Sequence, residues 1–277
     1  MKNKLTPIDI QQQRFTIRFR GYNTIEVDSF LDQTTETLEL MIGENEMMRQ
    51  ENHKLGIENK FEGNFIKVFP KTEIQKQTIV VESDWSSASY FYSIVALSKI
   101  GSEITLSAYK KENLQGDSCL AEIYQHFGVE TVFGEHSIIL KKTKVSNKEI
   151  LDIDLKNAPD IAQTIAVTCF AEKIACNLSG LHTLKIKETD RLEALHDELS
   201  KLGALISVTD KSLHLEKSSE IKKNIAIKTY SDHRMAMAFA PLALLVPIKI
   251  LNAEVVTKSY QKFWEDMQQI GIVINEL

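Results

Sequence analysis

The run KETDR at residues 187–191 opens a segment whose leucines recur every three or four positions, a spacing that predicts a helix. Arg191 lies four positions after Lys187 and three after Glu188, so the three side chains share one side of that helix. A helix amino terminus carries partial positive charge and attracts anions. A solvated charge cluster is the plainer interpretation of such a run. Two cations at the positive end oppose the helix dipole, however, and this opposition favours an anion-binding site.

A second charged group stands in the segment TYSDHRMAMAF at residues 229–239. Ser231 or Asp232 is a suitable helix N-cap, which leaves His233 and Arg234 in the first turn. Lys258 follows a predicted strand and precedes a predicted helix. If these strand-to-helix junctions meet, two arginines and a lysine form a site for a small polyanion that carries carboxylate and phosphate groups.

A threefold repeat must position these residues. From residue 56 onward a strand, a helix, a strand, a second helix and a hairpin follow one another, and this order recurs twice. The predicted strands include residues 79–83 in the first copy, 182–186 in the second and 272–277 in the third. Each first helix opens on an aspartate and each second helix closes on a glycine: Asp84, Asp160 and Asp232, with Gly128, Gly203 and Gly271. Three βαβαββ repeats that bury one another predict a single α/β domain.

At these residues the chain resembles a known enzyme family. The segments KETDRLEAL and YSDHRMAMA are similar to the two signatures of the 5-enolpyruvylshikimate-3-phosphate synthases, and SDWSSASYFY at residues 83–92 is similar to the opening of their second domain. The sister family, the UDP-N-acetylglucosamine enolpyruvyl transferases, lacks KETDR. The resemblance covers residues 56–277 and implies the enolpyruvyl-transferase fold, half of an inside-out α/β barrel.

The resemblance implies a catalytic role for three residues. Asp160 is the expected base for the 5-hydroxyl of shikimate 3-phosphate, and Lys187 is expected to steady that hydroxyl. Glu188 is expected to transfer a proton at the methylene carbon of phosphoenolpyruvate. The implied reaction is addition followed by elimination through a tetrahedral ketal, with release of phosphate.

The same resemblance implies the residues that bind substrate. Arg191, Arg234 and Lys258 are expected to hold phosphoenolpyruvate, and His233 is expected to support them. The family reaction needs no metal and no cofactor. Family enzymes work in a cleft between two such domains, whereas one domain is recognisable in this sequence. We therefore expect a partial 3-phosphoshikimate 1-carboxyvinyltransferase that is inactive without a second domain.

Residues 27–55 carry a different pattern, in which apolar and small polar residues alternate in steps of four and three. A period of 3.5 over four heptads predicts a two-stranded coiled coil. With Leu31 at an a position, Asn45 and Asn52 also fall at a, where paired asparagines favour a parallel, in-register dimer. The alternative is one amphipathic helix packed on the rest of the protein.

The segment TPIDIQQQRFTIRFRGYNTIEVDSFLD, at residues 6–32, resembles the amino-terminal domain of the bacterial cell-division scaffold DivIVA. That resemblance covers residues 3–55 and defines a predicted first domain, residues 1–55, ahead of the second at 56–277. It implies that a turn exposes Phe19 and Arg20 to an anionic membrane surface. The alternative is that Phe19 is a core residue. A DivIVA-like dimeric scaffold carrying a passive globular domain is therefore the alternative function, and the junction suggests a fusion.

Composition limits the remaining possibilities. The 277 residues carry a formal net charge of -5, which argues against a general nucleic-acid binder. Three cysteines without paired spacing, Cys119, Cys169 and Cys176, are typical of buried thiols in a reducing cytoplasm. No apolar run approaches the ~18 residues of a membrane span. We expect a cytoplasmic protein, peripheral at the inner face of the membrane if the first domain binds lipid.

The heptads generate a testable prediction. The full chain should be a parallel dimer held by residues 27–55, and a chain cut at residue 55 should leave residues 56–277 monomeric. Light scattering at micromolar concentration measures both masses. A monomeric full-length chain would show that the heptad interpretation is wrong.

Overall fold

The computed structural model describes residues 13, 15–18, 21–22, 27, 30–31, 34, 58–62, 65–70, 76, 78 and 81–275. The chain divides into two compact units, Met1–Ile79 and Val80–Leu277. Each unit is described by itself.

The first unit contains two short antiparallel hairpins. Strand β1 (Ile17–Arg18) pairs with β2 (Gly21–Tyr22), and β3 (Asn59–Glu62) pairs with β4 (Phe65–Val68). The ring of Phe15 meets that of Phe30 edge-on, with centroids 5.5 Å apart. Residues 27, 30, 31 and 34 are helical, and the Thr34 hydroxyl donates to the Phe30 carbonyl. The described heptad positions are thus consistent with a helix after the first hairpin.

Several predictions for this unit fall outside the described residues. Phe19 and Arg20, the predicted membrane-binding pair, lie between β1 and β2 at positions that the structure does not describe. Most of the heptad segment at residues 27–55 is also outside the description. The division into units falls at residue 79 because the β3–β4 hairpin belongs to the first unit. The boundary at residue 55, the membrane contact and the dimer stay predictions.

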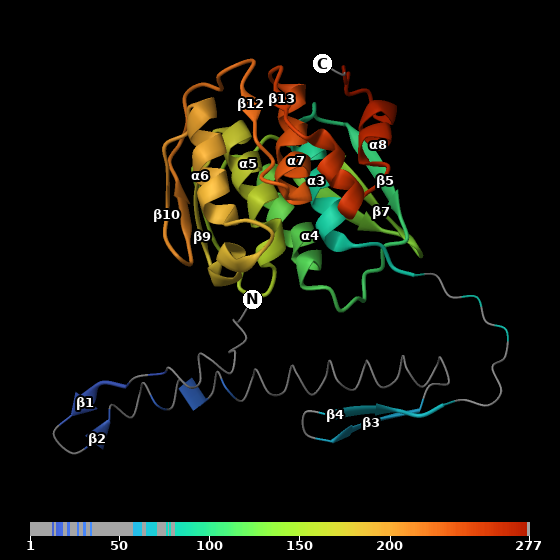
Figure 1. The fold of residues 1–277 in the computed structure, drawn as a ribbon, viewed down its shortest axis with the longest axis vertical. Helices are drawn as coiled ribbons and strands as arrows, with labels where there is room; N and C mark the ends of the chain where they lie inside the picture. Colours follow the sequence, from blue (N-terminus) through green and yellow to red (C-terminus); the bar gives the residue numbers. More distant parts are fainter. Residues whose placement is uncertain are drawn as a thin grey trace. The chain divides into compact units, whose positions relative to one another are not determined.

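In the second unit, three sheets follow one another along the chain, with helices between their strands (Figure 1). The first sheet has the order β5-β7-β6, with β5 (Glu103–Ser107), β6 (Val129–Phe133) and β7 (Ser137–Lys142). The second has the order β10-β11-β9-β8, with β8 (Ile150–Asp154), β9 (Ala175–Ser179), β10 (Ile206–Val208) and β11 (Leu213–Leu215). The third is a parallel pair, β12 (Ala226–Ile227) and β13 (Lys249–Ile250). In the second and third copies, the strand before the inner helix pairs in parallel with the strand after it.

Each copy contributes one inner helix: α3 (Trp85–Leu97), α5 (Ala162–Glu172) and α7 (His233–Phe239). Helix α5 contacts both α3 and α7, and Figure 1 shows the three side by side between the first and second sheets. The outer helices are α4 (Leu120–Ile123), α6 (Arg191–Leu202) and α8 (Phe263–Gln269). Within the described residues, no helix is long and apolar enough to cross a bilayer.

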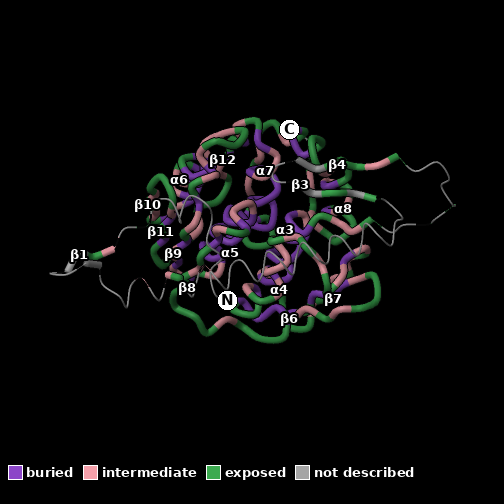
Figure 2. The backbone as a smooth tube through the Cα atoms, turned by 90° about the horizontal axis from the view of Figure 1, so that it is seen from below, coloured by how far each residue is buried: buried purple, intermediate pink, exposed green. Residues whose placement is uncertain are grey.

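Small side chains let the inner helices approach one another. The hydroxyls of Ser89 and Thr164 lie 3.0 Å apart between α3 and α5, and Thr168 donates to Ser93 at 2.8 Å one turn farther along. All four side chains are buried, and each has a hydrogen-bonding partner, as buried polar groups require. Figure 2 shows buried residues concentrated along α3, α5 and α7. The inner helices therefore form the rigid core that places the helix ends.

The structure corrects three element predictions. Residues 182–186 form a 3-10 helix, and the strand of that copy is β9, which ends at Ser179, just before Gly180. Gly180 has a φ of 77°, and a Cβ there would collide with the Asp154 carboxylate and the Lys156 amide. Residues 272–275 form no strand, and residues 81–83 form none. A strand at 79–83 or at 272–277 would need a pairing partner far along the chain, which local propensity does not encode.

Candidate functional site

Arg191 opens helix α6, and its side chain is buried. The helix begins after Asp190, whose side chain accepts hydrogen bonds from the amides of Leu192 and Glu193 as an N-cap. Only 1% of the surface of Arg191 is exposed. A buried guanidinium requires partners for its charge and its N–H groups.

Three carboxylates supply those partners. The Nε of Arg191 donates to Asp232 Oδ2 at 2.6 Å, Nη1 donates to Asp160 Oδ1 at 2.9 Å, and Nη2 donates to Glu188 Oε2 at 2.6 Å. Asp232 is the N-cap of α7 and is fully buried, whereas Asp160 lies in a 3-10 turn (Pro159–Ile161) before α5. Arg191 therefore joins the starts of three helical segments.

Two further cations hold Asp160. The Lys187 Nζ lies 3.1 Å from Asp160 Oδ1, and Arg234 Nη2 lies 3.3 Å from Oδ2. Burial acts to raise the pKa of Asp160, but Arg234, Lys187 and Arg191 together outweigh burial and hold that pKa below 3.8. Asp160 is therefore ionised at neutral pH, which is the protonation state that a general base needs.

The structure also brings His233 and Lys258 to this region. Burial lowers the pKa of His233 below its ordinary 6.5, against the opposing effect of the Asp232 carboxylate. His233 is therefore neutral at pH 7, and its Nδ1 is buried without a hydrogen-bond partner among the described residues. Lys258 ends a 3-10 helix (Ala253–Lys258), and its Nζ donates to the Ser231 carbonyl at 2.8 Å.

The cations of the site differ in how far they face outward. The side chain of Lys187 is 33% exposed and that of Arg234 is 14% exposed, while that of Arg191 is 2% exposed. Lys258 is exposed. Lys187, Arg234 and Lys258 are therefore accessible from solvent, whereas Arg191 is enclosed by the carboxylates to which it donates.

Sequence reasoning missed two residues near this cluster and undervalued a third. Asp232 was expected only as a cap, but it is also the most buried carboxylate that Arg191 binds. Asp117 accepts a hydrogen bond from Ser86, and burial raises the pKa of its carboxyl group. Tyr90 is buried on α3, and burial raises the pKa of its hydroxyl group against the opposing effect of the Arg234 charge. Tyr90 falls within the segment SDWSSASYFY at residues 83–92, but no spacing in that segment pointed to the cluster.

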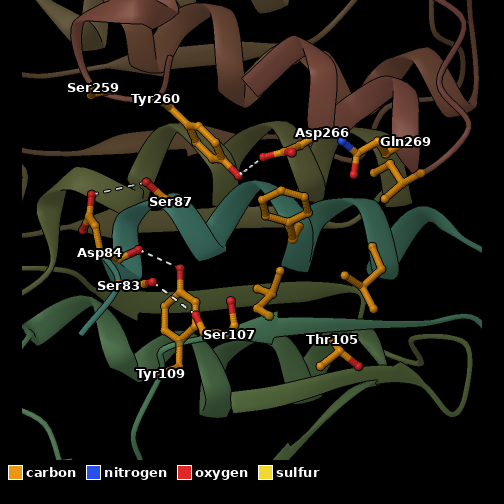
Figure 3. Close-up of a pocket in the computed structure, with 14 residues that line it drawn as sticks. Ser83, Asp84, Ser87, Thr105, Ser107, Tyr109, Ser259, Tyr260, Asp266 and Gln269 are labelled. Atoms are coloured by element: carbon orange, nitrogen blue, oxygen red, sulfur yellow. Dashed lines mark hydrogen bonds between the residues drawn. The ribbon is translucent and has the colours of Figure 1, made fainter. Parts of the chain in front are cut away.

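A hollow of about 650 Å³ lies between the start of α3, the edge of β5 and helix α8 (Figure 3). Asp84, Ser87 and Tyr260 line it, and the cluster residues around Arg191 do not. No group of three or more His, Cys, Asp or Glu side chains in the described residues is arranged to hold a metal ion. The charged cluster around Arg191 therefore lies outside this hollow.

The pattern of the EPSP synthase (3-phosphoshikimate 1-carboxyvinyltransferase) family matches residues 34–267. The chain belongs to this family. The 3-phosphoshikimate 1-carboxyvinyltransferase of Bacteroides fragilis strain ATCC 25285 is 44% identical over 197 residues, which are 70% of this chain and 48% of the relative. That of Methanospirillum hungatei JF-1 is 33% identical over 195 residues, 70% of this chain and 44% of the relative. The chain thus spans about half the length of these curated relatives.

Solved structures have the same fold. The EPSP synthase of Acinetobacter baumannii superposes with a TM-score of 0.65 at 23% identity, covering 80% of this chain and 53% of that one. The enolpyruvyl transferase NikO of Streptomyces tendae superposes with a TM-score of 0.55 at 14% identity, covering 88% and 54%. The EPSP synthase-like α/β fold implied by the resemblance is therefore confirmed.

The buried position of Arg191 generates a prediction about stability. Arg191→Ala leaves the Asp232 carboxylate buried without a counter-ion, so the free energy of unfolding should fall by about 3–5 kcal/mol. Arg234→Ala should cost less, because the Asp160 carboxylate that it releases keeps Lys187 and Arg191 as partners. Urea denaturation followed by circular dichroism measures both losses. An Arg191→Ala variant as stable as Arg234→Ala would show that the guanidinium does not organise the cluster.

Proposed function

We propose that this chain provides the phosphoenolpyruvate-binding half of a 3-phosphoshikimate 1-carboxyvinyltransferase site. The observation that carries the proposal is an ionised Asp160 held between Lys187 and Arg234, with Arg191 beneath it. A carboxylate that accepts a proton, next to cations that can bind a phosphate-carboxylate substrate, suits this transfer.

In the proposed reaction, Asp160 accepts the proton of the 5-hydroxyl of shikimate 3-phosphate, and Lys187 steadies that oxygen. The oxygen bonds to the central carbon of phosphoenolpyruvate, while the methylene carbon gains a proton and becomes a methyl group. The tetrahedral ketal then loses phosphate and one methyl proton, which restores the enol double bond. Glu188 handles the proton at this carbon. Burial acts to raise the pKa of Glu188, but its own backbone N–H and Arg191 outweigh burial and lower that pKa, so the free residue is ionised. In the proposal it takes up a proton from solvent and delivers it to the methylene carbon in the addition, and it accepts the methyl proton in the elimination.

In the same proposal Arg234 and Lys258 contact phosphoenolpyruvate through their exposed surfaces. Arg191 adds charge from below, and neutral His233 supports the helix end at which the anion sits. The reaction needs neither metal nor cofactor, because cations stabilise the developing charge and carboxylates move the protons. Phosphoenolpyruvate and shikimate 3-phosphate are the proposed small-molecule partners.

A second proposal concerns residues 1–55. We propose that they form a DivIVA-like module that dimerises and places Phe19 and Arg20 on an anionic membrane. The supporting observation is the tight pairing of β1 with β2, which leaves only positions 19 and 20 between the strands. This module would make the protein dimeric and peripheral to the membrane. The anion site would belong to the second unit alone.

The anion site generates a prediction for the isolated chain. Phosphate and phosphoenolpyruvate should bind in the millimolar range, about -4 kcal/mol, because the cluster is open to water and salt. Arg234→Ala should remove most of this binding. Arg234→Lys should not restore it, because an ammonium lacks the paired donors of guanidinium. The control Lys141→Ala removes an exposed cation of β7 that pairs with Glu103, and it should bind as the parent does. Titration followed by NMR measures all four, and parental affinity in Arg234→Ala would refute the site.

Turnover generates a separate prediction. The 277-residue chain alone should release no phosphate from phosphoenolpyruvate and shikimate 3-phosphate, because the relatives are about twice as long. Adding the separately produced amino-terminal half of the Bacteroides fragilis relative should restore release, and Asp160→Asn should abolish the restored rate. A normal rate from the pure chain alone would contradict the half-site proposal. A mixture that stays inactive although both halves bind would favour the scaffold.

A further inference from the structure

The turn that leads into α7 has a strained backbone. Tyr230 and Ser231 have φ values of 54° and 57°, and the Asp232 amide donates to the Thr229 carbonyl at 2.8 Å across them. Two left-handed residues in the middle of a turn are ordinarily glycine or asparagine, because other side chains crowd the backbone there. A strained conformation persists only where surrounding contacts enforce it, and such strain gathers at functional sites.

The first of these contacts comes from Glu198. The Tyr230 hydroxyl donates to Glu198 Oε1 at 2.6 Å. The Glu198 side chain is fully buried, and it also accepts from Lys201 Nζ at 2.6 Å and from the Lys228 amide at 3.2 Å. Burial and the hydrogen bond to Glu198 both raise the pKa of Tyr230, so its hydroxyl stays a donor at any physiological pH.

Helix α6 thus holds the turn at two points. Glu198 lies seven residues after Arg191, two helical turns along the same face. Arg191 binds Asp232 at one end of the turn, and Glu198 binds Tyr230 within it. Lys258 provides a third anchor, because its Nζ donates to the Ser231 carbonyl.

The turn is followed directly by the residues that face the ligand. Asp232 Oδ1 accepts from the Arg234 amide at 2.8 Å, so the direction of the turn sets where α7 begins. We propose that Glu198 and Tyr230 form a positioning pair, which holds the strained Tyr230–Ser231 turn so that Arg234 and the start of α7 point at the bound phosphate group. This inference rests on the proposed function, and nothing in it requires either residue to touch the ligand.

The test uses Tyr230→Phe in the full chain. This variant removes one hydroxyl and leaves Glu198 paired with Lys201. The turn should relax, so the backbone amide shifts of residues 231–234 should move in the absence of ligand, and phosphate affinity should fall about tenfold. Tyr92→Phe is the matched control. It removes a hydroxyl that bonds to Thr131 on β6, and it should leave those amide shifts and the phosphate affinity unchanged.

A rescue variant separates positioning from general stability. Glycine adopts positive φ without crowding, so adding Ser231→Gly to Tyr230→Phe should restore most of the affinity and return the amide shifts toward those of the parent. Ser231→Gly alone should raise the thermal midpoint and keep phosphate affinity. If Tyr230→Phe does not fold, Ser231→Gly alone still tests the inference. A thermal midpoint that is unchanged or lower than that of the parent means that the turn stores no strain, and the inference fails.

The failures of the two proposals are distinguishable. If the parent chain does not bind phosphate, the proposed function fails, and the amide shifts of Tyr230→Phe alone decide the positioning role. If the parent binds and Tyr230→Phe keeps both its shifts and its affinity, the positioning pair is overturned. A loss of affinity that Ser231→Gly does not rescue would also contradict it, because the loss would then come from something other than the turn.

Discussion

The guanidinium of Arg191 donates to carboxylates from three separate segments, and this contact organises the second unit around its site. Asp160 precedes α5, Asp232 caps α7 and Glu188 precedes α6, so one buried cation fixes the starts of three helices. Buried charge is costly unless each group is paired. The cost makes the arrangement specific, since moving any one segment would leave a charge without its partner.

The inner helices make that contact possible. Serine, alanine and threonine at the contacts of α3 with α5 bring the helices close, and their hydroxyls bond to one another. The packed inner helices determine where each helix begins. The helix starts determine where the carboxylates lie, and Arg191 holds these carboxylates together by donating to them. The outward cations, Lys187, Arg234 and Lys258, then rest on a preorganised base, as an electrostatic site requires.

Much of the fold and of the site could be predicted from the sequence, because the residues responsible lie close together in the chain. The repeat, the cap aspartates at positions 84 and 232, and the cations at helix starts all follow from spacing and residue type. The strand predicted at 182–186 was wrong. Its residues alternate as in a strand, but the strand of this copy is β9, which precedes the turn at Gly180. The Glu198–Tyr230 contact spans 32 residues, and Arg191 to Asp232 spans 41. Pairings at such separations have no local signature. The heptads and the DivIVA-like motif lie mostly outside the described residues and stay predictions.

A double-mutant cycle between Arg191 and Asp232 tests the central claim most directly. The free energy of unfolding is measured for the parent, Arg191→Ala, Asp232→Ala and the double variant, at one pH near 7. If the buried pair organises the cluster, each single variant leaves a buried charge behind, and the double variant costs less than the sum of the two. We predict a coupling of about 2–3 kcal/mol. Losses that simply add, within about 0.5 kcal/mol, would contradict the account.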